Sequence, residues 1–302
     1  MWEGESLLMA EISSELNKKL SEAVGKMPAF PKSVQRILEL SRDLNCPPKE
    51  LVSVIEKDPV MTMKLLHIIN SAYYSFPKQI TSVNQAIVYI GLNTIKNMAL
   101  SFAVIGVLPQ HNAAGYDMQR YLMHSLITAS LARLLCQKFN KDGTDPGDCS
   151  LAGLLHDFGK VVFAQFMPEE FKQAMAYSAE HKVPLHIAEQ HVIGIDHSEV
   201  GAMLVEGWQF PKNLSFAIRS HHNPAEFKTT LQCCLFVADI LSKHKSLNYG
   251  AESDREIMAE LPPAIAERFG GNLDEIIVKL GDLSNVVAEA QAFAQTSKVT
   301  PT

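Results

Sequence analysis

Apolar residues recur at helical spacing along almost the whole chain, and no stretch alternates convincingly with the period of two that a half-buried strand shows. In segment 5–24, for example, Leu8, Ile12, Leu16 and Leu20 follow one another at a spacing of four. The pattern predicts an all-α protein with short connections. The expected helices lie at about 5–24, 34–40, 48–55, 59–70, 82–90, 93–108, 117–139, through 156–157, from 197, from 211, at 230–243 and at 272–295.

Local signals support several of these helices and one boundary. Asp58 followed by Pro59 predicts a cap and a first helical residue, and Ser82 followed by Gln85 is typical of a capping box. Pro109, Asn112 and Gly115 cluster near residue 110. We therefore predict an N-terminal helix at 1–24, a small helical lobe at 25–110, a larger helical bundle at 111–245 and a helical extension at 246–302.

Composition and charge restrict the function. The 302 residues are 47% hydrophobic and carry a net charge of −6, with 27 basic residues scattered among 33 acidic ones. Nucleic-acid binding needs a dense basic surface, so DNA is not an expected partner. Segment 59–108 looks like a helix-turn-helix, but 83–95 contains no Lys or Arg.

Location is predicted from the cysteines and from the apolar segments. The five cysteines form no C-x-x-C pair and are typical of reduced thiols. The N-terminus lacks a signal-peptide layout, and the most apolar run, 98–108, is too short for a bilayer. The sequence predicts a soluble cytoplasmic protein without a membrane segment.

The candidate chemistry centres on His156 and Asp157, which stand side by side in an otherwise apolar run. Burying an unpaired neutral polar group costs roughly 2–7 kcal/mol, and a charge costs more. Neighbours on a helix point about 100° apart, so the two side chains are poorly placed to bond to each other. A shared divalent metal suits both an imidazole and a carboxylate. Asp239 poses the same problem, because its helix has little polar surface.

The other candidate metal ligands could also have ordinary structural roles. Taken alone, His124 could be a surface or satisfied core histidine, His197 a helix N-terminal residue, and His221 with His222 a helix C-terminus. His67 is expected to lie on a polar stripe of its helix, and the remaining histidines are expected to be solvated: His111, His181, His186, His191 and His244.

Charge sharpens the metal hypothesis. With neutral imidazoles, the two aspartates contribute −2, so one divalent ion gives a neutral site and two ions leave +2. The second case would attract a phosphate and lower the pKa of a bridging water. Asp157 is the natural bridging carboxylate, and Lys160 lies on about the same helix face, where it could meet a phosphate oxygen.

In their order along the chain, these residues resemble the H…HD…D pattern of the HD superfamily of metal-dependent phosphohydrolases. The matching positions are His124, His156-Asp157 and Asp239, while His197 with Gly201 and the His221-His222 pair resemble the extra ligands of two-metal members. Over about 25–225, further motifs resemble the HDOD domain, the HD-related output domain of bacterial signalling proteins. These motifs include Asp58-Pro59, Asn70-Ser71-Ala72, Ile90-Gly91-Leu92 and Asp196-His197-Ser198-Glu199-Val200-Gly201.

The resemblance implies a small helical N-terminal lobe packed on an HD-type bundle, and a role in bacterial signal transduction. Many HDOD domains have lost metal ligands and act by binding, whereas this sequence keeps every position. No GYP segment follows His222, and Arg120 stands where a carboxylate can occur. The resemblance therefore does not extend to a third metal or to cyclic di-GMP as substrate.

Two functions are compatible with these residues. In the first, the protein is a regulatory module that binds a signalling protein, a phosphorylated small molecule or a nucleotide. In the second, it is a phosphohydrolase or phosphodiesterase in which Asp157 and Lys160 are catalytic. The hydrolase requires one or two divalent ions (Fe, Mn, Zn or Mg), whereas the regulatory module would be stabilised by a ligand or by such a metal. His124, His156, Asp157 and Asp239 would hold the first, and Asp157, His197, His221 and His222 the second.

The segment 272–295 bears on the oligomeric state. Its apolar stripe could pair two copies in a homodimer, or it could pack on its own domain.

Overall fold

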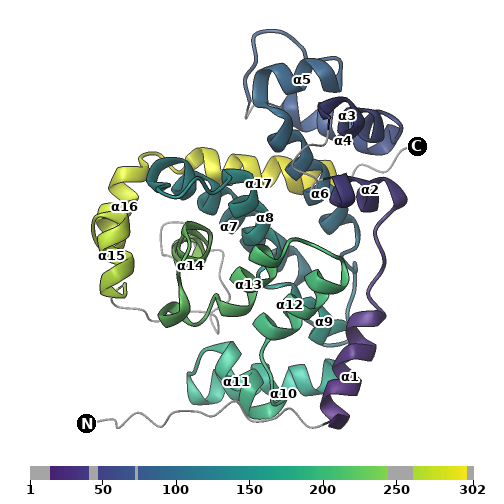
Figure 1. Ribbon diagram of the computed structural model, residues 1–302. Helices are drawn as coiled ribbons and strands as arrows, with labels where there is room; N and C mark the ends of the chain where they lie inside the picture. Colours follow the sequence, from purple (N-terminus) through teal and green to yellow (C-terminus); the bar gives the residue numbers. More distant parts are fainter. Residues whose placement is uncertain (1–13, 41–46, 72–73, 244–260, 298–302) are drawn as a thin grey trace.

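The computed structural model describes residues 14–40, 47–71, 74–243 and 261–297, and within these ranges every regular element is a helix. The all-α prediction is therefore confirmed. Figure 1 shows the arrangement. The first six helices are α1 (Ser14–Gly25), α2 (Lys32–Leu40), α3 (Pro48–Glu56), α4 (Pro59–Ile69), α5 (Val83–Ile90) and α6 (Leu92–Gly106). The helices that follow are α7 (Met118–Phe139), α8 (Pro146–Leu155), α9 (Phe158–Phe166), α10 (Pro168–His181), α11 (Leu185–Val192), α12 (His197–Gly207), α13 (Lys212–Ser220), the short 3-10 helix η1 (Pro224–Glu226), α14 (Thr230–Lys243), α15 (Pro263–Phe269), α16 (Leu273–Leu280) and α17 (Ser284–Ser297).

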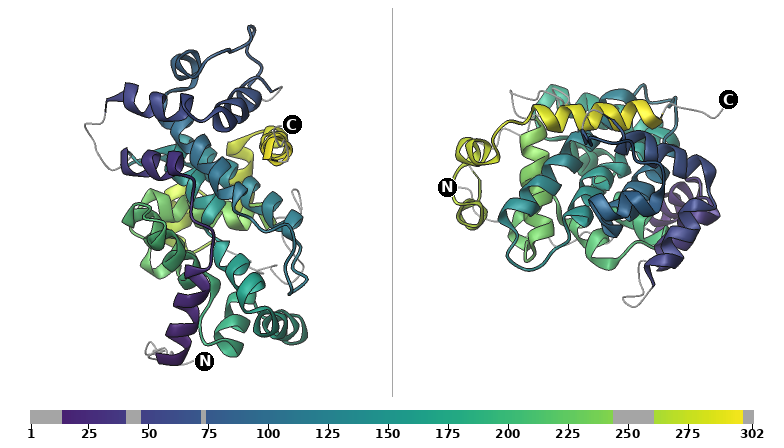
Figure 2. Two further views of the ribbon diagram at one scale, coloured as in Figure 1. Left: turned by 90° about the vertical axis from the view of Figure 1, so that its right-hand side faces the viewer. Right: turned by 90° about the horizontal axis from the view of Figure 1, so that it is seen from above.

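The lobe formed by α2–α5 stands at one end of the molecule, and α6 runs from it into the bundle (Figures 1 and 2). Its helices begin where the sequence predicts. The Asp58 side chain accepts a hydrogen bond from the Met61 backbone N–H at 3.0 Å, and the Ser82 hydroxyl accepts one from that of Gln85 at 3.1 Å. These caps satisfy backbone donors that have no partner inside the helix.

The bundle is built around α7, against which α8, α14 and α17 pack. Its contact with α8 is close because of a glycine. A Cβ atom at Gly153 would lie 2.6 Å from the Ala129 Cα and backbone N, nearer than real Cβ contacts allow. This close packing fixes how His124 on α7 and His156 at the end of α8 face each other.

The predicted continuous helix through His156 and Asp157 is broken in the structure. Helix α8 ends at Leu155 and α9 begins at Phe158, with Asp157 at φ −95° and ψ 7° between them. On an unbroken helix the two side chains would diverge by about 100°. The turn between α8 and α9 instead lets both of them point into the same space.

The C-terminal stretch also differs from the prediction. The helix expected at 272–295 is two helices, α16 and α17, separated after Gly281, whose φ is +83°. Val286, Ala290 and Phe293 of α17 are buried, and α17 packs on α4, α6 and α7 of the same chain. The apolar stripe thus has a partner within its own chain. The first part of the helix expected at 5–24 lies outside the described residues, which begin at Ser14.

No single helix in the described part of the chain is both long and apolar enough to cross a bilayer. Helices α5 and α6 reach that length and composition only together, and they are bent by 117° where they meet.

The substitution Gly153→Ala is expected to lower the free energy of unfolding by about 1–3 kcal/mol, because the added methyl group meets the backbone of α7. Urea denaturation followed by circular dichroism measures this change. Gly106→Ala is the matched control, since a Cβ there meets no atom within 4 Å. Equal stability of the two variants would contradict the close α7–α8 packing.

Candidate metal centre

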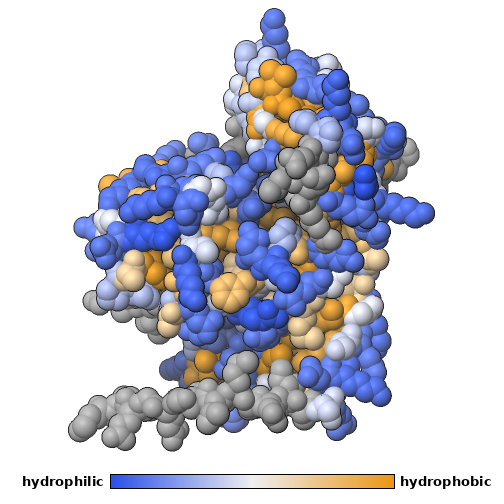
Figure 3. Space-filling view, viewed as in Figure 1, coloured by the Kyte–Doolittle hydropathy of each residue, from blue (hydrophilic) through white to orange (hydrophobic). Residues whose placement is uncertain are grey.

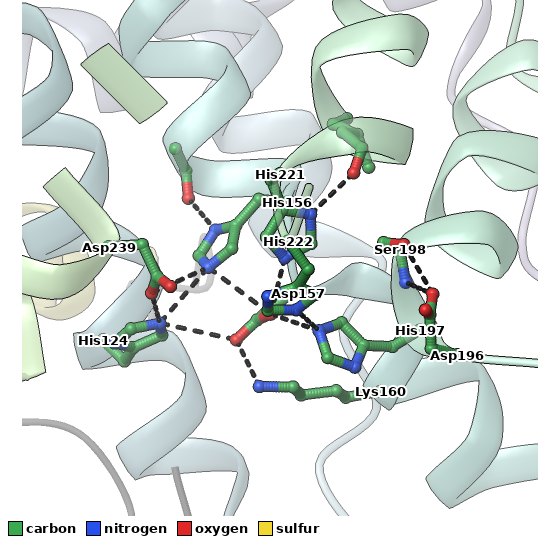
Figure 4. Close-up of polar contacts among 12 residues, drawn as sticks. His124, His156, Asp157, Lys160, Asp196, His197, Ser198, His221, His222 and Asp239 are labelled. Carbon is green, nitrogen blue, oxygen red and sulfur yellow. Dashed lines mark hydrogen bonds and ion pairs between the residues drawn. The ribbon is translucent and has the colours of Figure 1, made fainter. Parts of the chain in front are cut away.

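All seven residues that the sequence singles out as metal-capable come together in the bundle (Figure 4). Asp157 lies at the centre. Its Oδ2 is 3.4 Å from His124 Nε2, and its Oδ1 is 3.1 Å from His197 Nε2. The ligand-bearing positions belong to different elements: His124 to α7, His156 and Asp157 to the α8–α9 turn, His197 to the first position of α12, His221 and His222 to the end of α13, and Asp239 to α14.

Backbone carbonyls fix the orientation of two of the imidazoles. His156 Nδ1 lies 2.8 Å from the Gly153 carbonyl oxygen, and His221 Nδ1 lies 2.6 Å from that of Ile218. A carbonyl oxygen can only accept, so each Nδ1 carries the hydrogen. In the neutral ring the lone pair is then on Nε2, which faces the centre.

Side chains fix two more in the same way. The Ser242 hydroxyl donates to the Asp239 carbonyl at 2.7 Å, so it accepts from His124 Nδ1 at 3.1 Å. The Glu189 carboxylate accepts from His197 Nδ1 at 2.5 Å and from the His197 backbone N–H at 2.8 Å. Four histidines thus have Nδ1 held by an acceptor and Nε2 turned inward.

The inward-facing atoms form two groups that could each hold a metal ion. In the first, His124 Nε2 and His156 Nε2 are 3.3 Å apart, and Asp239 Oδ1 lies 3.2 and 3.4 Å from them. In the second, His222 Nε2 and His197 Nε2 are 2.9 Å apart. The first group consists of His124, His156 and Asp157, with Asp239 beside them, and the second consists of His197, His221 and His222.

The donor set fits a divalent cation. Lone pairs and carboxylate oxygens that face one another in a buried space repel, and they need a cation or protons between them. His221 Nε2 and Asp239 Oδ1 form no hydrogen bond with any residue that the structure describes. Imidazole nitrogen and carboxylate oxygen are ligands for Fe, Mn and Zn, so the residues present suit the group that the HD pattern implies.

Protonation within the centre is uneven. Burial and the neighbouring imidazoles hold the pKa values of His221 and His222 well below the ordinary range, which leaves both rings neutral. Burial also lowers the pKa of His197, but Glu189 opposes it and raises the pKa to about 9. A metal at His197 would therefore displace a proton, so its binding should release acid.

Two lysines complete the electrostatics. Lys160 Nζ donates to Asp157 Oδ2 at 2.8 Å, and Lys243 Nζ donates to Asp239 Oδ2 at 2.7 Å. Both ammonium groups are nearly buried, with 2% and 8% of the side chain exposed. Each carboxylate of the first group is thus already paired with one cation of the protein.

Sequence reasoning missed several residues of this site. Glu189 orients His197, Ser242 orients His124, and Lys243 neutralises Asp239. For Glu189 the sequence offers one signal, a carboxylate next to the apolar residue Ala188 in an amphipathic helix. The prediction that His186 is solvated is wrong. Its ring is half-buried and stacks on that of His222, with centroids 4.0 Å apart, and burial lowers its pKa to about 4.

Comparison with known proteins identifies a family and several relatives of this chain. The HDOD domain family matches residues 27–224. An uncharacterised protein of Treponema pallidum (strain Nichols) is 26% identical over 233 residues, which is 75% of this chain. The match spans only 45% of that relative's length.

Solved structures share the fold. An HDOD domain protein of unknown function from Geobacter sulfurreducens superposes with a TM-score of 0.75 at 24% identity, over 93% of this chain and 97% of that one. A candidate phosphohydrolase from Shewanella amazonensis SB2B gives 0.71 at 20% identity, over 91% and 98%. A candidate signal transduction protein from Marinobacter aquaeolei VT8 gives 0.73 at 23%, over 95% and 66%.

Replacing Glu189 by Gln should weaken Mn²⁺ binding about 10–100-fold, because the carboxylate that orients His197 and raises its basicity is lost while an amide oxygen remains to accept the hydrogen bond. Isothermal titration calorimetry with Mn²⁺ measures the affinity. Glu180→Gln, at an exposed position of α10, is the control. Unchanged Mn²⁺ affinity in the Glu189 variant would show that this carboxylate does not support a metal ligand.

Proposed function

The chain belongs to the HDOD domain family, and we propose that it is a regulatory module of bacterial signal transduction whose centre holds one or two divalent ions and binds a phosphorylated ligand. The observation that carries this proposal is the convergence of four inward-facing imidazole nitrogens on the carboxylates of Asp157 and Asp239.

The residues divide between two ions that share Asp157. His124, His156, Asp157 and Asp239 would hold one, and Asp157, His197, His221 and His222 would hold the other. When bound, such ions supply positive charge and Lewis acidity. Because Lys160 and Lys243 already balance the two aspartates, Glu189 is the remaining carboxylate beside the centre, and it neutralises only part of the charge of an added ion. A phosphate group is the anion that this excess would attract.

Burial favours binding over turnover. His156 is 0% exposed, and Asp157 and Lys160 are each 2% exposed. Among the proposed ligands, His222 alone is more than marginally exposed, so it marks the side from which a phosphate would approach. A reaction cycle needs repeated exchange of substrate and product, which a closed centre slows.

The lobe supports a regulatory role in a second way. In the described part of the chain, the groups of three or more metal-capable side chains lie at the bundle centre, outside the lobe. The lobe instead exposes large apolar side chains at Val60, Met63, Val88 and Tyr89, and Figure 3 shows apolar surface gathered there. Such a surface is typical of protein contacts, so a signalling protein is the proposed partner of the lobe.

The second candidate function is phosphoester hydrolysis, and the Lys160–Asp157 pair favours it. Lys160 would turn from Asp157 Oδ2 to a phosphoryl oxygen and hold the substrate, while Asp157 orients the reacting water. The Shewanella relative is described as a candidate phosphohydrolase and the Marinobacter relative as a candidate signal transduction protein, so the relatives support both functions.

Metal analysis of the purified protein tests the centre. We expect bound Fe, Mn or Zn in the wild type and at least about tenfold less bound metal in Asp157→Ala, because both proposed ions lose the ligand that they share. Inductively coupled plasma mass spectrometry measures the content. Asp274→Ala, at an exposed position of α16, should keep the metal. Metal-free protein in all three, with intact circular dichroism, would contradict both functions.

Turnover separates the two candidates. The metal-loaded wild type should bind inorganic phosphate but leave p-nitrophenyl phosphate and bis(p-nitrophenyl) phosphate intact over hours. Hydrolysis that disappears in Asp157→Ala and persists in Asp274→Ala would replace the regulatory proposal by the hydrolase.

A further inference from the structure

A cavity of about 570 Å³ lies between the lobe end of α6, the bundle helices α7 and α8, and α17. It is separate from the metal centre. At about 100° per residue, Ala129, Ser130 and Arg133 of its wall occupy the face of α7 opposite His124. Its size is that of a site for a small organic molecule, for which about 300–1,000 Å³ is usual.

The wall of this cavity contains a buried carboxamide without a partner. Asn97 is 5% exposed, and neither its side-chain oxygen nor its nitrogen forms a hydrogen bond within the described part of the chain. Leaving both unpaired costs free energy, on the order of 1–3 kcal/mol for each group. Gly147 makes room for this side chain, since a Cβ there would lie 1.9 Å from Asn97 Nδ2. The carboxamide thus lies packed against Gly147, and no residue in the described part of the chain satisfies it.

The charges of the cavity disfavour phosphate. Asp145 and Glu289 contribute two carboxylates, and the single guanidinium, that of Arg133, already bonds to Glu289 at 2.6 Å. Asp145 is likewise engaged, by the Gly147 backbone N–H at 2.7 Å and by Asn93 Nδ2 at 2.7 Å. An uncharged ligand fits these surroundings better than an anion, in contrast to the centre on the other face of α7.

The remaining wall suits a flat ring with a polar substituent. Tyr74 and Phe293 provide aromatic surface, and Ser130 and Gln137 provide a hydroxyl and an amide for sugar hydroxyls. An asparagine carboxamide presents a donor and an acceptor side by side, which matches the N6 and N7 atoms of adenine.

We propose that this cavity binds an adenine nucleoside without a phosphate, and that the Asn97 carboxamide turns from Gly147 toward the cavity to bond to the adenine edge. The site goes beyond the metal centre. Its ligand is neutral, and it sits on α7 and α8, which also carry His124 and lead to His156.

Calorimetric titration of the full chain with adenosine tests the proposal. Adenosine should bind with a Kd below about 1 mM. Asn97→Leu, which keeps the volume and removes the amide, should weaken binding at least about tenfold. Asn213→Leu, at an exposed position of α13, should not change it. In a competition titration, AMP should bind at least about tenfold more weakly than adenosine, because its phosphate meets the two carboxylates.

A second variant tests the cavity independently, in case Asn97→Leu does not fold. Ser130→Leu extends into the cavity from another helix and should also weaken adenosine binding, while circular dichroism and Mn²⁺ affinity stay at the wild-type level. The proposal is overturned if adenosine does not bind, if neither cavity variant weakens its binding, or if AMP competes as well as adenosine. Loss of metal binding in Asp157→Ala leaves this test intact, so the two proposals fail separately.

Discussion

The Nδ1 hydrogen bonds of four histidines are the constraint on which the centre depends. A carbonyl, a hydroxyl or a carboxylate holds each ring by Nδ1 and turns Nε2 toward the centre. Without these anchors the rings could turn and relieve the repulsion by bonding to each other. Because they cannot, the bundle keeps a set of acceptors whose stability requires positive charge, and Lys160 and Lys243 supply only part of it.

The bundle and the lobe differ in which side chains they bury and which they expose. The bundle encloses polar groups in apolar helices, where an electrostatic interaction is strong because water is excluded. The lobe does the reverse and presents apolar side chains to solvent at Val88 and Tyr89, which are 83% and 52% exposed. Helix α6 connects the two, and α17 packs on both α4 and α7. A movement of the lobe relative to the bundle would therefore be transmitted through α17 to α7, the helix that carries His124.

Much of the fold and the main outline of the site could be predicted from the sequence. The sequence singles out Asp239 and Asp157 as site residues because a carboxylate in an apolar helix needs a partner. The structure places both beside imidazoles. The break after Leu155 could not be predicted, since no Gly or Pro occupies positions 155–158 and the turn depends on packing with other elements. Glu189 was missed for a related reason. Its partner His197 is eight residues away across a turn, and an acid on a short amphipathic helix is usually solvated. The break at Gly281, in contrast, had a local signal, a glycine that can adopt positive φ.

The dispersal of the ligands along the chain has a consequence for biosynthesis. Asp239 lies 115 residues after His124, and the positions between them come from separate helices. During translation, α7, α8 and α9 can pack before α14 has left the ribosome, while His124, His156 and Asp157 still lack their last partner. Long-range contacts of this kind form late. The centre is therefore complete only when α14, the last helix that carries a proposed ligand, has packed on α7 and α8.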